Sequence, residues 1–165
     1  MKRRKFRHTA PPRAPTLGGM SSTTPHRPLA PRILVSLVAL ATSVGPYAAD
    51  FNATHIYNPT WPPHAKFHTA QTMLLGLALG ACSLAFAWRK AGDARASFRV
   101  AAVFAALYWI TQLASITFPG TAFVDPERAG TGLLLGIPAQ VVISAVSLAL
   151  VGVALALEGR KPAGG

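Results

Sequence analysis

Three histidines, His55, His64 and His68, occur in one proline-rich segment of the chain, shortly after the carboxylate Asp50. A flexible loop would not need three prolines, so this segment is expected to hold its side chains in fixed positions. Pro63 suits the first turn of a helix, where a missing N–H is harmless, and His64 and His68 then lie one helical turn apart.

Three kinds of chemistry fit these residues. His55, His64 and His68 with Asp50 could bind a metal ion, because imidazole pairs and a carboxylate are common metal ligands. His64 or His68 with Asp50 could instead carry out acid–base catalysis on a lipid-soluble substrate. The third interpretation is a binding or accessory protein, whose polar outer vestibule holds an apolar ligand or a partner helix. We favour the third slightly; the sequence identifies no cofactor and leaves open whether the chain is an enzyme.

Long apolar runs surround this segment. The chain has 165 residues, of which 51% are hydrophobic and 13% charged. A soluble domain of this size could not bury so much apolar surface, whereas a bilayer accepts it. Because backbone polar groups in lipid must be satisfied within helices or closed barrels, we predict an all-α, four-helix transmembrane bundle. The predicted spans are about 33–49, 67–88, 100–118 and 133–157 within a domain of residues 32–158.

The net charge of +11 is concentrated at the ends of the chain and in the loop between the second and third spans. This distribution is typical of cytoplasmic flanks and of contact with a lipid bilayer, not of nucleic-acid binding. It predicts a multi-pass protein of the cell membrane with both termini in the cytoplasm. Residues 1–31 are predicted to form a disordered basic tail and residues 159–165 a short cytoplasmic tail. Because the first span is short, a cleaved signal peptide is the alternative for that segment.

Each predicted span carries polar residues at helical spacing, which are expected to face the interior of the bundle. These are Ser43, Tyr47 and Asp50; His64, His68 and Gln71; Tyr108, Gln112 and Ser115; and Gln140, Ser144 and Ser147. Gln112 and Gln140 should both lie roughly 10 Å below the outer surface. The predicted ligand-binding residues are His55, Asn58, Trp61, His64, His68, Gln71, Tyr108, Gln112 and Gln140.

Gly76 and Gly80 form a G-x-x-x-G pattern in the second span. Small residues at this spacing let two helix backbones approach closely. We expect them to pack within the bundle, with homo-oligomer formation through the same glycines as the alternative.

The outer segment resembles a known signature. Thr54-His55-Ile56-Tyr57-Asn58-Pro59, followed by Trp61-Pro62-Pro63-His64-Ala65-Lys66-Phe67-His68, is similar to that of a family of small four-helix membrane proteins of unknown function. The resemblance implies the four-span architecture and an important outer loop, and it implies no particular reaction.

Overall fold

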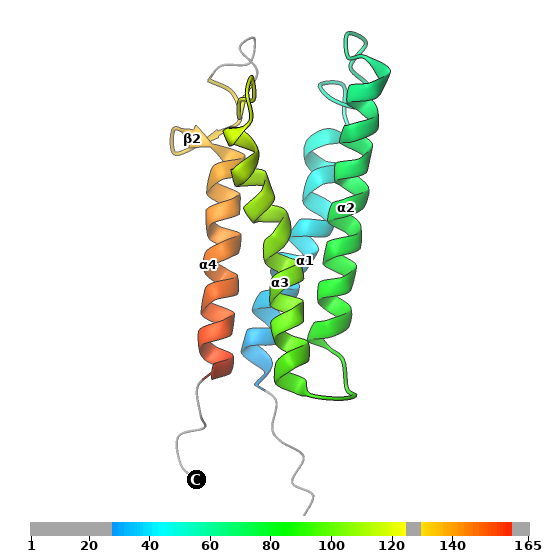
Figure 1. Cartoon of the computed structure of the whole chain (residues 1–165). Coiled ribbons are helices and arrows are strands. Elements are labelled where there is room, and N and C mark those ends of the chain that lie inside the picture. The colour runs from blue at the N-terminus through cyan, green and yellow to red at the C-terminus, as the bar shows by residue number, and fades with distance from the viewer. Residues whose placement is uncertain (1–27, 125–129, 160–165) are drawn as a thin grey trace, which may run out of the picture.

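The structure is a computed structural model, which describes residues 28–124 and 130–159 (Figure 1). Its elements are α1 (Leu29–Asp50), α2 (Pro63–Ala87), α3 (Ala94–Ala114), a 3₁₀ turn η1 (Ser115–Thr117), β1 (Leu133–Leu134), β2 (Ile137–Pro138) and α4 (Ala139–Gly159). Within the described ranges, all four long helices are long and apolar enough to cross a membrane. The predicted all-α, four-helix architecture is therefore confirmed.

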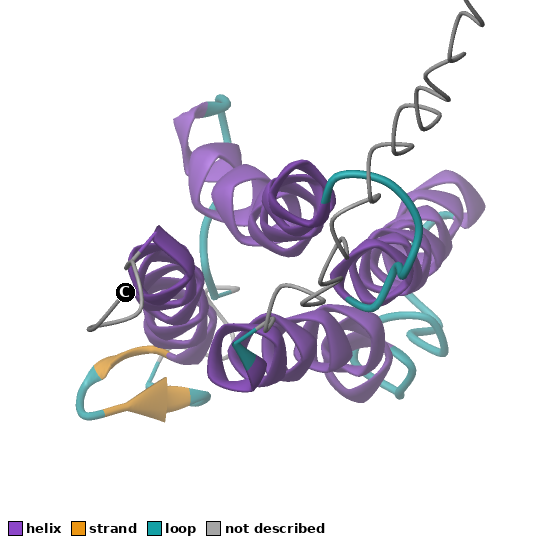
Figure 2. Cartoon of the chain, turned by 90° about the horizontal axis from the view of Figure 1, so that it is seen from below, coloured by secondary structure: helices purple, strands orange, loops and turns teal. Residues whose placement is uncertain are grey.

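The four helices form one bundle around a common centre, seen end-on in Figure 2. Helix α1 packs against α2 and α4, and α3 contacts the same two helices. The small hairpin of β1 and β2 lies outside this ring beside α4.

Helix α1 is longer than the predicted first span. It runs for 22 residues from Leu29 and contains Pro46, so residues 29–31 belong to a helix instead of the predicted tail. The rest of that tail, residues 1–27, and residues 160–165 at the other terminus lie outside the described residues. Because α1 contacts all three other helices, its cleavage as a signal peptide would remove one wall of the bundle.

The predicted fourth span begins too early. Residues 133–138 form a two-stranded hairpin, in which Leu134 pairs with Ile137, and α4 starts only at Ala139. Leu135 and Gly136 between the strands both have positive φ, 54° and 78°. This is the two-residue turn that matches the twist of paired strands. Hydropathy alone does not separate such a hairpin from a helix, although Gly136 and Pro138 could have indicated the break.

Gly76 and Gly80 pack within the bundle, as expected. Both are buried, and a β-carbon at Gly76 would lie 2.7 Å from the carbonyl oxygen of Thr42 in α1. A β-carbon at Gly80 would overlap the backbone oxygen of Ala39 and the hydroxyl of Ser43. Contact between α1 and α2 therefore requires glycine at both positions, and α1 already occupies the face that a homo-oligomer through these glycines would use.

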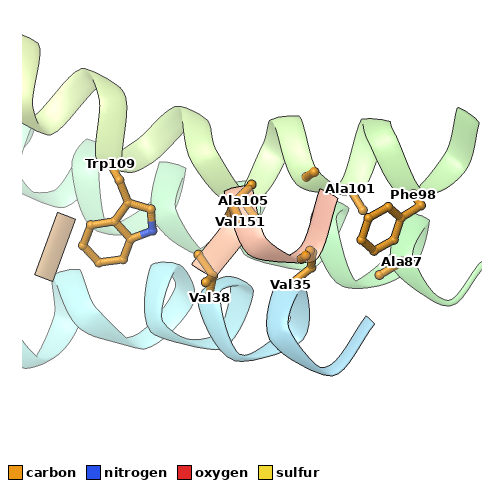
Figure 3. Packing of buried hydrophobic residues seen from close by; sticks show 10 residues of the cluster. Val35, Val38, Ala87, Phe98, Ala101, Ala105, Trp109 and Val151 are labelled. Atoms are coloured by element: carbon orange, nitrogen blue, oxygen red, sulfur yellow. The ribbon is translucent and has the colours of Figure 1, made fainter. Parts of the chain in front are cut away.

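The apolar core extends along the bundle axis, from Phe98 near the start of α3 to Trp109 near its end (Figure 3). Val35 and Val38 from α1, with Val151 from α4, fill the space between them. Apolar side chains thus dominate the interior, and small hydroxyl side chains such as Thr42, Ser83 and Ser144 are buried among them.

The two ends of the bundle differ in composition. Helix α1 begins, α4 ends and the α2–α3 turn lies at the same end, called the terminal end below (Figure 1). There the Arg32 guanidinium lies 5.6 Å from the ring centroid of Trp88, whose indole N–H donates to Ser36. Aromatic and cationic side chains together are typical of a membrane–water interface. The opposite end, which carries residues 51–62, residues 118–124 and the hairpin, is called the loop end.

At the terminal end, Asp93 caps α3. Its carboxylate accepts hydrogen bonds from the backbone N–H groups of Arg95, at 2.8 Å, and Ala96, at 3.2 Å. These bonds, with that from Ala96 the larger cause, lower the pKa of Asp93. A lowered pKa means that the stabilisation is present at neutral pH and is lost as the pH falls through the folded-state value.

The start of α1 and the end of α4 both lie at the terminal end, as the predicted topology requires. A topology experiment decides whether this end faces the cytoplasm. Reporter fusions at Gly92, in the α2–α3 turn, are expected to be cytoplasmic, and fusions at Thr60, in the loop end, are expected to be external. The reason is the excess of Lys and Arg at the terminal end. A cytoplasmic signal from Thr60 would reverse the orientation.

Candidate functional site

A cavity of about 790 Å³ opens in the loop end of the bundle. Its walls are the ends of α1 and α3 and the start of α4, and residues from the adjoining loops complete it. Figure 1 shows α1 and α2 separating from α3 and α4 toward this end. The cavity is therefore a vestibule on one side of the apolar core.

Six of the predicted site residues line this vestibule. They are Asp50, His55, Trp61, Tyr108, Gln112 and Gln140. They come from α1, the 51–62 loop, α3 and α4, so three of the four predicted polar stripes do meet. Ser144 and Ser147 continue the α4 stripe as buried residues below the cavity, whereas Ser115, beyond the end of α3, is exposed.

The stripe predicted for α2 does not reach the vestibule. His64, His68 and Gln71 are exposed, and none of them lines the cavity. The reason is helical phase: Gly76 and Gly80 must face α1, and at 3.6 residues per turn His68 lies about 80° and Gln71 about 140° from the direction of Gly76. Extending the small-residue face of α2 toward its start would have indicated this from the sequence.

The exposed α2 residues form a chain of their own. The Nε2 atoms of His64 and His68 are 3.1 Å apart, and Nδ1 of His68 lies 3.1 Å from Oε1 of Gln71. The amide oxygen accepts, so Nδ1 of His68 donates to it. With one proton on each ring, Nε2 of His68 then accepts from His64. Each ring is partnered along the helix surface and points away from the vestibule.

The loop before α2 is held by side-chain to backbone hydrogen bonds as well as by prolines. The Oδ1 atom of Asn52 accepts from the N–H and hydroxyl of Thr54, and Oδ1 of Asn58 accepts from both groups of Thr60. Such local bonds fix tight turns. Asn58 thus shapes the loop and does not line the cavity, although it was predicted to bind ligand.

At the rim of the vestibule, the loop brings His55 to Asp50. Nε2 of His55 lies 3.6 Å from Oδ1 of Asp50, and both side chains are partly buried, with 31% and 22% of their surface exposed. The ring of Trp61 packs edge-on against the imidazole, at 5.2 Å between centroids. This packing and the ion pair fix the imidazole in one place.

The hydrogen bonds around His55 determine where its protons lie. The single hydroxyl proton of Thr54 points to Asn52 Oδ1, at 2.6 Å, so the Thr54 oxygen accepts from Nδ1 of His55, at 2.8 Å. In a neutral ring with Nδ1 protonated, Nε2 is a bare lone pair. A second proton on Nε2 would point an N–H at the Asp50 carboxylate, and this is the form in which the contact is an ion pair.

The predicted metal set divides into two separate pairs. His55 lies with Asp50 at the vestibule, and His64 lies with His68 on the surface of α2. Within residues 28–124 and 130–159, no three His, Cys, Asp or Glu side chains come together as a metal site would require. The described structure therefore does not bring these four candidate ligands together at one position.

The sequence interpretation missed Trp109. Its side chain is 4% exposed and lines the vestibule, and its indole N–H has no hydrogen-bond partner among the described residues. Oε1 of Gln112, one turn further along α3, is also buried without a hydrogen-bond partner among the described residues. Buried polar atoms are almost always paired, so these two are exceptions within the wall of the vestibule. The signal in the sequence was an indole N–H deep in an apolar span, three residues before a glutamine.

Gln140 has a structural role at the same site. Its amide nitrogen donates to the carbonyl oxygen of Phe123, and its own backbone oxygen accepts from the hydroxyl of Ser144. The first of these bonds ties the start of α4 to the segment after η1. Gln140 therefore positions one wall of the vestibule while contributing to its lining.

The chain was compared with protein-family models, curated proteins and solved structures. No curated protein and no solved structure gives a significant match. One family model, described as a family of unknown function, DUF6640, matches residues 34–165. This range includes all of the vestibule and nearly all of the four apolar helices. The chain is an integral membrane protein that belongs to the DUF6640 family of unknown function.

Proposed function

We propose that this protein of the cell membrane binds a small, largely apolar molecule with one polar group in the vestibule at its loop end. The observation that carries the proposal is the convergence of polar side chains from three helices, Asp50, Gln112 and Gln140, on one cavity with otherwise largely apolar walls. An apolar cavity with a few convergent polar groups is the usual form of a small-molecule site.

The size of the vestibule also supports a small molecule. About 790 Å³ lies within the range of roughly 300–1,000 Å³ that is typical of small-molecule sites. Its lining combines apolar side chains such as Ile143 and Val44 with a few polar groups, which is the usual composition of such sites. A partner helix is the less favoured occupant, because it would need a longer groove.

The test uses two matched tryptophan variants. Protein purified in a mild detergent is expected to retain a discrete apolar molecule in native mass spectrometry. Trp109→Phe should lose most of it, because the smaller ring removes part of the vestibule wall that the ligand contacts. Trp88→Phe should retain it, because Trp88 bonds Ser36 at the terminal end. Retention by Trp109→Phe, or wild-type protein without any ligand, would contradict the proposal.

The pair of Asp50 and His55 supports a second candidate function. A histidine and a carboxylate in contact beside a cavity have the composition of a general acid–base pair. The candidate catalytic residues then become His55 and Asp50, in place of His64 and His68. In this case His55→Gln should remove turnover and leave the ligand bound.

A further inference from the structure

A second, apolar cavity of about 360 Å³ lies between α1 and α4. Leu37 and Val38 of α1 form one wall, and Val146 and Leu150 of α4 form the other. Leu134 of the hairpin also lines it. From Ile143 to Leu150, α4 advances about 10 Å, so the groove extends over two helical turns.

The groove and the vestibule adjoin each other. Ala41 of α1 and Ile143 of α4 line both. Below this pair the lining is almost entirely apolar, and above it stand Asp50, Gln112 and the Trp109 indole. The two spaces are therefore neighbours, the upper one with polar groups in its wall and the lower one almost entirely apolar.

The outer surface of the groove faces the lipid. Leu37 and Val146 are each 53% exposed, and both belong to helices that are apolar enough to span a membrane. In a bilayer, hydrocarbon chains are the molecules beside such a surface. An acyl chain can thus lie between α1 and α4 without crossing water, while a head group attached to it reaches the vestibule.

From these observations we propose that the ligand is a single-chain amphiphile with an uncharged, hydroxyl-bearing head, whose head lies in the vestibule and whose chain lies in the groove between α1 and α4. This inference rests on the proposed binding function. The polar side chains of the vestibule wall, among them the amide of Gln112 and the imidazole of His55, can hydrogen-bond such a hydroxyl.

The charges at the vestibule favour an uncharged head. Among the described lining residues, Asp50 and His55 are the acidic and basic side chains, and they face each other. No described Lys or Arg lines the cavity to compensate a phosphate. An uncharged head needs no such counter-charge, and the polar groups of the wall suffice to hold it.

The test compares two monoacylglycerols that differ only in chain length with one anionic lipid that has the same long chain. Native mass spectrometry of the full chain would measure the binding of monomyristoylglycerol, monobutyrylglycerol and the anionic lysophosphatidic acid with a myristoyl chain. Wild-type protein is expected to prefer monomyristoylglycerol over both. Val146→Trp, which fills the groove without touching the vestibule, should weaken binding of the long chain by at least about tenfold. Exclusion of only two methylene groups already produces a factor of that size. Binding of monobutyrylglycerol should not change.

Val103→Trp is the matched control, because Val103 is 56% exposed on α3 and lines neither space. It should bind all three probes as the wild type does. Leu37→Trp, on the opposite wall of the groove, should repeat the effect of Val146→Trp, which would show that the effect does not come from a local folding defect at Val146.

Equal long-chain binding by wild type, Val146→Trp and Leu37→Trp would overturn the proposed chain site in the groove and leave the vestibule as a site. Preference for lysophosphatidic acid would overturn the uncharged head. A wild type that binds neither monoacylglycerol and carries no ligand would overturn this inference together with the proposed function.

Discussion

Replacing Gly80 with leucine is expected to prevent the bundle from folding. The first atom of any side chain there would overlap the backbone oxygen of Ala39 and the hydroxyl of Ser43. The backbone oxygen cannot move without displacing α1, so the two helices must separate. Overpacking a well-packed interior typically costs about 1–3 kcal/mol, and a rigid backbone contact places leucine at or above the upper end of that range.

The measurement is thermal unfolding in detergent together with size-exclusion chromatography. Gly152→Leu is the matched control, because a β-carbon added at Gly152, a helical glycine of α4, would meet no atom within 4 Å. We expect Gly152→Leu to elute and unfold like wild type, and Gly80→Leu to aggregate. Gly80→Ala should fall between them. If the glycines instead joined two copies, Gly80→Leu would halve the particle mass and leave the unfolding temperature unchanged.

Removing either partner of the pair formed by Asp50 and His55 is expected to destabilise the loop end. Breaking a fully buried ion pair costs about 3–5 kcal/mol, and partial exposure with solvent screening reduces this to about 1–2 kcal/mol here. The loss arises because the remaining side chain, the Asp50 carboxylate or the His55 imidazole, keeps its partly buried polar atoms but no longer has a partner. Asp50→Ala and His55→Ala should each show this loss, and the double variant should lose less than the sum of both.

The double-mutant cycle is measured by the free energy of unfolding in detergent. His64→Ala and His68→Ala are the matched controls, because both histidines are exposed on α2. Their effects should stay within about 0.5 kcal/mol, as is usual for surface changes. Additive losses for Asp50→Ala and His55→Ala would show that the two side chains do not interact. A larger loss for His68→Ala would show that the α2 histidines, which the sequence emphasises, matter more to the fold.

The two sets of histidines show what a pattern in sequence can and cannot predict. Spacing correctly placed His64 and His68 one turn apart on one face of α2, because that depends only on local helix geometry. Spacing could not say which direction this face takes. That direction depends on where α2 touches α1, and the touching face is set by Gly76 and Gly80, which carry no chemistry.

Composition and hydropathy by themselves determined that the chain forms four apolar helices, because each span must satisfy its own backbone in lipid. Helical spacing further predicted that the stripes containing Asp50, Gln112 and Gln140 face the interior, and these three residues line the vestibule. Only the tertiary structure decided which side chains meet. It paired Asp50 with His55, turned residues 133–138 into a hairpin and brought the Trp109 ring to the wall of the vestibule. These outcomes depend on helix rotation, loop hydrogen bonds and contacts between distant segments, and periodicity within one segment carries no information about them.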